Sequence, residues 1–350
     1  MTGRGHSHDP GSPCTCCGPV SLQAQDDDED DEDSDSTRNA ATRTTTDLRR
    51  ARQQAREALR GLSDDVDDFL SGLDAGRIVN DPSAEQRLNE QLTRLARGRL
   101  RDELLQWLSE RRKVTMGRAA RSSFDRMQTT LTGVGVARDL VGRSSLSRED
   151  RQINRMVDDV DAGLLEDLSD EAATELTRQI RLGFQQREDM REIGRRVDMV
   201  LVDGDDPDRQ KKGVTGQTIM SKGELIAHDS VQDAYEHAAR RRYLKNGFRY
   251  ATFDAVIDFK TSTVCRRMDE VVIDMVEDPH FVPPLHPWCR SDIRPSLNMD
   301  EQQVVTDDDI ADDFLQTIYS TKSYRPTEPA NQYFRPTALT RQGADPADVR

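Results

Sequence analysis

Two cysteines and one histidine are the residues whose types and spacing best suit chemistry. Cys265, His286 and Cys289 fall within the stretch 258–294. Thiolate sulfur and imidazole nitrogen are common zinc ligands, and a cysteine beside a histidine can also act as a nucleophile with its base. Twenty residues separate Cys265 from His286, so a shared site requires that two distant parts of the chain meet.

Prolines restrict the loop that carries the histidine. Residues 283–290 read Pro-Pro-Leu-His-Pro-Trp-Cys-Arg. Proline fixes its own φ angle and drives the preceding residue toward extended geometry. We therefore expect His286 to be held between constrained neighbours, with Cys289 close behind it.

Three interpretations of this group fit the residues. The first is a structural zinc site in which Cys265, His286 and Cys289 are ligands and Asp258 or a water molecule completes the tetrahedron. Such a metal would join two loops of a small module that has little core of its own.

The other two interpretations need no metal. In the second, Asp258 caps a turn through backbone amides and pairs with Lys260 or Arg290, while both cysteines are small buried apolar residues. In the third, Cys265 is a nucleophile and His286 its base, although the sequence shows no sign of the oxyanion hole that such hydrolases need.

A small α+β module over residues 221–298 is predicted to position these side chains. A capping box at Ser221 and Glu224 indicates the start of a helix that ends at Asn246-Gly247. The segments that follow are predicted as a strand at 248–258, a polar turn at 258–265, a second strand at 271–276 and a third short strand at 290–295.

A mostly helical domain is predicted over residues 46–200, because apolar residues recur there at helical spacing. The predicted helices are 47–61, 83–108, 117–140, 147–160, 169–184 and 189–197. Ser147 and Ser169 are interpreted as caps of separate helices. Residues 201–220 are polar and are predicted to be a linker.

Both ends of the chain are predicted to lie outside these domains. Residues 1–45 hold Cys14, Cys16 and Cys17 and an acidic run, which indicates a disordered arm or, alternatively, a small metal-binding knuckle. Residues 299–350 are predicted to form one further helix around 310–318 and then an extended tail.

The composition is polar and acidic. Charged residues make up 33% of the chain, the net charge is −15, and only seven of the 50 basic residues are lysine. An acidic, lysine-poor surface is typical of a halophilic cytoplasm, and a GC-rich genome gives the same bias. With no apolar run of membrane-spanning length and no signal peptide, we expect a soluble, cytosolically made protein without a membrane partner.

Arginines cluster on the predicted helices, at positions 94–101 and 111–121. Such clusters either contact nucleic-acid phosphates or pair with acidic residues. Interspersed acids such as Asp102 and Glu110 favour ion-paired, solvated helix faces, with local DNA contact as the alternative.

The order of motifs in the C-terminal module resembles the Mu F-type phage head morphogenesis domain. The matching features are a helix ending in Lys-Asn-Gly247, an aromatic strand, Asp-x-Lys-Thr-Ser-x-x-Cys at 258–265, and Pro-Pro-x-His-Pro-x-Cys-Arg at 283–290. With its helical lead-in, the resemblance covers residues 170–295.

The sequence departs from the family's pattern at several positions. It has Lys260 where the family has arginine, and Ser262 and Ser291 where the family has cysteines. His-Asp-Ser at 228–230 replaces an Arg-Thr-Glu of the family. The two serines leave fewer ligands for a metal than the family pattern holds.

The resemblance implies a minor head protein of a tailed virus, and the composition suggests a haloarchaeal host. Such a protein would be a low-copy, non-enzymatic virion component at the portal vertex or capsid interior. Its implied partners are the portal protein, the major capsid protein and packaged double-stranded DNA. The alternative is an enzyme or effector built on a Mu F-like module, with Cys265 and His286 catalytic.

Overall fold

The computed structural model describes most of the two predicted domains. The described residues are 38–73, 82–135, 148–201, 218–297 and the short pieces 304–306, 310, 312–316 and 318. Within them the chain is mostly helical and has one small antiparallel sheet near its C-terminal end, which confirms the α+β class at this level. Most of the predicted arm, linker and extended tail lies outside the described residues.

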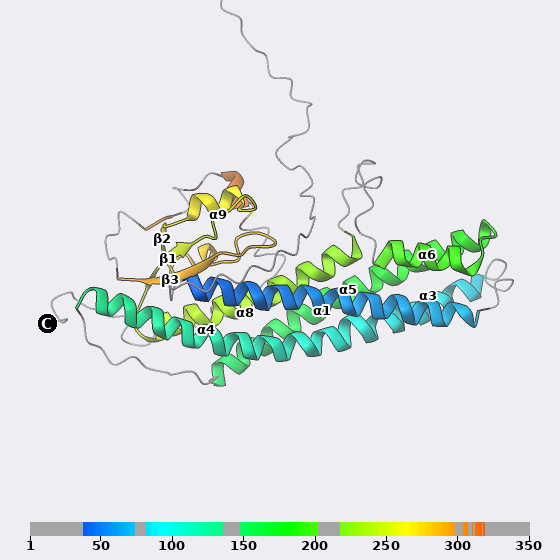
Figure 1. Cartoon of the computed structure of the whole chain (residues 1–350), viewed down its shortest axis with the longest axis horizontal. Coiled ribbons are helices and arrows are strands. Elements are labelled where there is room, and N and C mark those ends of the chain that lie inside the picture. Colours follow the sequence, from blue (N-terminus) through cyan, green and yellow to red (C-terminus); the bar gives the residue numbers. More distant parts are fainter. Residues whose placement is uncertain are drawn as a thin grey trace, which may run out of the picture. The chain divides into compact units, whose positions relative to one another are not determined.

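Long helices make up the N-terminal part of the fold (Figure 1). They are α1 (Arg38–Ser71), α3 (Pro82–Ala96), the π-helical segment η1 (Arg97–Leu104), α4 (Leu105–Gly133), α5 (Arg148–Gln185) and α6 (Met190–Leu201). α1 begins inside the stretch predicted as a disordered arm, so residues 38–45 correct that prediction. α3, η1 and α4 follow one another without a break, where the sequence had suggested two helices.

Two predicted helix boundaries, an end at Gly61 and a start at Ser169, are wrong because packing outweighs the local signals. α1 continues past Gly61, since Leu62, Val66 and Leu70 keep the apolar spacing and are buried. α5 continues through Ser169, whose hydroxyl donates to the Leu165 carbonyl at 2.6 Å within the helix instead of capping a new one.

The main core lies between these helices and consists chiefly of leucine and alanine. Its fully buried side chains include Leu59, Leu62, Leu92, Leu100, Leu104, Leu108 and Leu176. These residues recur at intervals of three or four along each helix, so every helix presents one apolar face to the core.

Helix α8 (Ile219–Lys245) is enclosed by other elements along most of its length. Of its 27 residues, 21 are buried, and it packs against α1, α4, α5 and the sheet. Its N-cap is Thr218, whose side chain accepts from the Ser221 amide at 3.1 Å. The predicted capping role of Glu224 is wrong, because its carboxylate accepts from Arg56 of α1 at 2.6 Å.

The sheet has three antiparallel strands in the order β2-β1-β3. The strands are β1 (Tyr250–Asp254), β2 (Val272–Asp274) and β3 (Asp292–Ser296), with α9 (Thr263–Met268) between β1 and β2 and a single 3-10 turn, η2 (Pro279–Phe281), before β3. Residues 312–316 are helical, as predicted for this part of the tail, and Ile318 is buried in the sheet's core.

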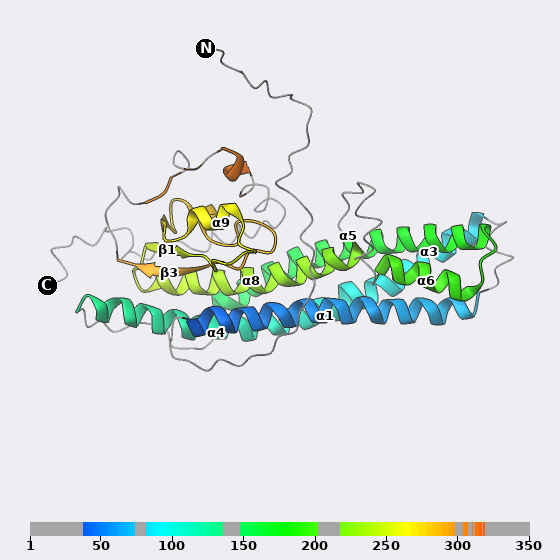
Figure 2. The same ribbon diagram turned by 45° about the horizontal axis from the view of Figure 1, so that its top comes forward.

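The sheet's core also contains side chains from the long helices. Met127 and Leu131 of α4 and Tyr243 of α8 belong to the same apolar cluster as Phe253 and Ile293 of the sheet. Figures 1 and 2 both place the sheet beside α4 and α8, and all the described residues fall in one compact unit.

Polar contacts also join the helices to the sheet. Arg126 of α4 donates to the Ile293 carbonyl of β3 at 2.7 Å and forms an ion pair with Asp292, also at 2.7 Å. The predicted module boundary near residue 220 therefore falls between elements that share both apolar and polar contacts.

Many helix arginines form ion pairs with acids from other helices. Arg97 of η1 pairs with Asp170 of α5 at 3.1 Å, and Arg99 pairs with Asp65 of α1 at 2.7 Å. Arg112 is fully buried between Asp158 and Asp161 of α5. These pairs agree with the ion-pairing interpretation, although the partners lie across helices more often than along them.

None of the described helices combines the length and the apolar run that crossing a lipid bilayer requires.

Candidate metal centre

Cys265 lies in the first turn of α9, which the sequence had suggested was only a polar turn. The side chain of Ser262 caps this helix by accepting from the Cys265 amide at 3.1 Å. Arg266 and Arg267 lie in its last turn, where positive charge is favoured by the helix dipole. The cap fixes where α9 begins and so places Cys265 in its first turn.

His286 and Cys289 lie on the loop between η2 and β3. The Cys289 amide donates to the His286 carbonyl at 3.1 Å, which closes a tight turn. Trp288 within this turn has a φ angle of +64°, a left-handed conformation that a bulky residue rarely adopts. The turn is attached to α8, because the Trp288 amide donates to Asp229 at 3.4 Å and its ring contacts that of His228.

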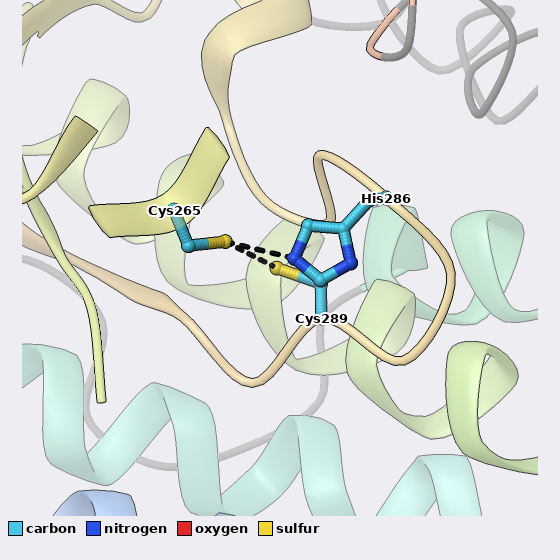
Figure 3. A group of neighbouring side chains, drawn as sticks. All are labelled: Cys265, His286 and Cys289. Atoms are coloured by element: carbon cyan, nitrogen blue, oxygen red, sulfur yellow. Dashed lines mark hydrogen bonds between the residues drawn. The ribbon is translucent and has the colours of Figure 1, made fainter. Parts of the chain in front are cut away.

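The three predicted ligand residues come together in the structure. The Cys265 Sγ atom lies 3.0 Å from His286 Nε2 and 3.6 Å from Cys289 Sγ. Figure 3 shows the three side chains pointing toward one another from α9 and from the loop. Both cysteines are buried free thiols, and the imidazole is half-buried at the edge of the group.

Hydrogen bonding fixes the tautomer of His286. Its Nδ1 atom lies 2.6 Å from the Pro287 carbonyl oxygen, which can only accept, so Nδ1 carries the proton. The lone pair of the neutral ring is therefore on Nε2, the atom that faces the Cys265 thiol and the Ser262 hydroxyl, the latter at 2.7 Å. Metal-binding histidines commonly have their second ring nitrogen held in this way.

The two thiols have opposite pKa shifts. A hydrogen bond from Cys289 is the main cause that lowers the pKa of Cys265 to about 7, and hydroxyl hydrogen bonds from Ser291 and Ser262 add to it against the effect of burial. Burial raises the pKa of Cys289 well above its ordinary value. Of the two, Cys265 is therefore the first to become a thiolate, which is the form that binds metals and attacks electrophiles.

Asp258, the fourth predicted ligand residue, is not part of this group. Arg290 donates to its two carboxylate oxygens at 2.8 and 2.7 Å, and the Lys260 amide donates to one of them at 2.8 Å. The hydrogen bond from Arg290 is the largest cause that holds the pKa of Asp258 well below its ordinary value. Asp258 thus stabilises a turn and forms an ion pair with Arg290, as in the interpretation that gives Asp258 a purely structural role.

Ser262 and Ser291 border the group, which the sequence analysis did not predict. Ser262 contacts His286, and the Ser291 side chain hydrogen-bonds to Cys265. These are the two positions at which the chain has serine where the resembled family has cysteine. That coincidence was the signal in the sequence that could have assigned them to the site.

Other polar groups of the module are engaged elsewhere. The His280 ring contacts Phe281 with 4.2 Å between ring centroids. A cluster formed by Asp254, Asp269 and Glu270 is neutralised in part by Arg294, which pairs with Asp254 at 3.2 Å and Glu270 at 2.5 Å.

Comparisons with protein-family models, with curated proteins and with solved structures gave no match for this chain.

Proposed function

We propose that this protein is a minor head protein of a tailed virus, which binds at or near the portal vertex and acts in procapsid assembly and in packaging or delivery of the genome. The resemblance of two separate stretches, 258–265 and 283–290, to the Mu F-type pattern suggests this class. The acidic, lysine-poor composition favours a halophilic host.

One observation carries the proposal. The residues that give the resemblance contact one another across the two stretches, through the Asp258–Arg290 ion pair and through Cys265, His286 and Cys289. A chance match between two short stretches gives no reason for their residues to meet. The contacts therefore support treating the two stretches as one motif.

The charge distribution favours protein partners. The net charge is −15, and many helix arginines are already paired with acids. Binding along a phosphate backbone needs unpaired cations and weakens steeply at high salt. We therefore propose the portal or major capsid protein as the direct partner, and packaged DNA as a neighbour.

The proposal is tested by quantitative mass spectrometry of gradient-purified proheads and virions. We expect the protein in both, at a copy number far below that of the major capsid protein. As a control, a host protein of similar abundance in the lysate should be depleted by the gradient. Absence of this chain from both particles would show that the proposal is wrong.

A thiol-dependent enzyme is the second candidate, because the Cys265 thiol with its pKa of about 7 lies 3.0 Å from an imidazole. The burial of Cys265 argues against an enzyme, since this residue is only 2% exposed and a nucleophile must reach its substrate. Alkylation of the native protein separates the two: rapid modification of Cys265 favours the enzyme, and protection until unfolding favours the structural role.

A further inference from the structure

We propose that Cys265, His286 and Cys289 bind one zinc ion, and that a water molecule, not a protein side chain, holds its fourth coordination position. This inference is independent of the viral function proposed above.

The donor set suits zinc in a buried place. Two thiolates and one neutral imidazole balance the two positive charges of the ion, so the complex as a whole is neutral. A neutral complex can lie among apolar side chains without the large desolvation cost of a bare charge. Both sulfur atoms are buried in the sheet's core.

The distances are close to those of a tetrahedral site. Zinc–sulfur bonds of about 2.3 Å separate two sulfurs by roughly 3.8 Å, and a sulfur and a nitrogen by roughly 3.6 Å. The Cys265 and Cys289 sulfurs are 3.6 Å apart, and Cys265 Sγ and His286 Nε2 are 3.0 Å apart. The imidazole and the Cys265 sulfur have to separate by about 0.6 Å, and all three ligand atoms already lie within 4.8 Å of one another.

The imidazole already presents the atom that zinc requires. Because Nδ1 donates to the Pro287 carbonyl, the lone pair on Nε2 faces the sulfurs without a change of tautomer. Zinc-bound histidines are commonly stabilised by a hydrogen bond from the ring nitrogen that does not bind the metal, and Nδ1 of His286 already makes this bond.

The fourth position is left to water, since no further cysteine, histidine or carboxylate of the described residues joins the group. Asp258 is held by Arg290. Hydroxyls of Ser262 and Ser291 border the group, and serine is not among the usual zinc ligands. These hydroxyls are suited to hydrogen-bond a zinc-bound water.

The first test measures zinc in the full chain. Cys14, Cys16 and Cys17 are replaced by serine in every sample, so that thiols near the N-terminus cannot contribute. Mass spectrometry of the purified protein should find on the order of one zinc per chain. Cys289→Ser should reduce this at least tenfold, whereas His280→Ala, a histidine outside the group, should leave it unchanged.

A second test does not depend on whether Cys289→Ser folds. Cobalt(II) added to the zinc-free protein should give the intense visible bands of tetrahedral coordination and the near-ultraviolet thiolate-to-cobalt band, both lost when zinc is added. Ser291→Cys should strengthen the near-ultraviolet band by about half, because it replaces the water with a third thiolate. The proposal is wrong if the protein contains no zinc and cobalt gives no such bands, or if Cys289→Ser retains the zinc.

Discussion

At the scale of single residues, Glu236 on α8 is a carboxyl group in an unusual environment. It is 1% exposed and accepts from Gln232 at 3.0 Å. Burial is the main cause that raises its pKa well above the ordinary value, and the nearby Asp292 adds to it while Arg126 opposes it. The single positive charge of Arg126 lies near two carboxyl groups, those of Asp292 and Glu236. It can balance only one negative charge, so we expect Glu236 to hold a proton in the folded protein.

Replacing Glu236 with glutamine should therefore stabilise the protein most at high pH. Below the ordinary pKa of glutamate, Glu236 is protonated in both folded and unfolded chains. Above it, the unfolded chain loses the proton that the folded chain retains, so the free energy of unfolding falls as the pH rises. Glu236→Gln removes this loss of stability. The loss is about 1.4 kcal/mol for each tenfold difference in proton affinity between the folded and the unfolded chain.

Urea unfolding at pH 5 and at pH 8 measures the effect. The difference between Glu236→Gln and the unmodified protein should grow with pH. Glu110→Gln is the matched control, because the Glu110 side chain is 69% exposed and pairs only with Lys113 among the contacts described. Equal effects at both pH values would contradict a protonated Glu236.

At the scale of elements, the contact between α5 and α6 depends on a position without a side chain. A Cβ atom on Gly183 of α5 would lie 2.7 Å from Ile193 Cγ1 of α6. Ile193 is fully buried in the main core, so it has little room to retreat. α6 can therefore lie this close to α5 at Ile193 only because residue 183 has no side chain.

Gly183→Ala should lower the free energy of unfolding by about 1–3 kcal/mol, the usual cost of overpacking a core. Gly163→Ala is its control in the same helix, since nothing lies within 4 Å of the added atom. That change should stabilise the protein by up to about 1 kcal/mol, because alanine is the better helix former. Thermal or urea unfolding that ranks the two variants in the opposite order would exclude this account of the contact.

Local signals predicted some helix starts and missed others. Asp189 starts α6 as expected, accepting from the Glu192 amide at 2.9 Å while Glu192 accepts from the Asp189 amide at 3.1 Å. Ser169 carries the same kind of signal, yet its hydroxyl bonds backward inside α5. A serine is compatible with a helix N-cap and with a helix interior, and its neighbours in space decide which of the two it occupies. α9 was missed because six residues are too few for an apolar period.

For the site, the sequence predicted the group of Cys265, His286 and Cys289, but it also offered Asp258, which lies outside the group. Prolines around His286 and the spacing to Cys289 were sufficient to predict that the two lie on one constrained loop. The meeting with Cys265 was an expectation from ligand chemistry. The contacts of Ser262, Ser291 and Trp288 depend on how α9, β3 and α8 pack, which no local pattern contains.

At the scale of the whole described unit, α8 contributes to both of the larger cores. Ile226 and Val231 pack in the main helical core, whereas Ala239 and Tyr243 pack in the core of the sheet. A helix shared in this way ties the stability of one core to that of the other. The predicted modules 46–200 and 221–298 should therefore unfold together.

Scanning calorimetry of the full chain should show a single unfolding transition for this unit, with equal calorimetric and van't Hoff enthalpies. Residues 218–297 expressed alone should show no cooperative transition, because they lack Met127 and Leu131 of α4. Adding residues 38–73, 82–135 and 148–201 to the fragment should restore it, because these helices complete both cores. Two separate transitions in the full chain would mean that the sheet and the helices are independent domains.

The contact between Arg126 and β3 has a mechanical consequence. A partner that grips the sheet and pulls would load the hydrogen bond to the Ile293 carbonyl and the ion pair to Asp292. Tension would then pass into α4 and α8, which pack side by side. Sliding two such helices past each other breaks many side-chain contacts at once. The sheet should therefore resist a pulling force better than a sheet joined to the helices by a flexible linker alone.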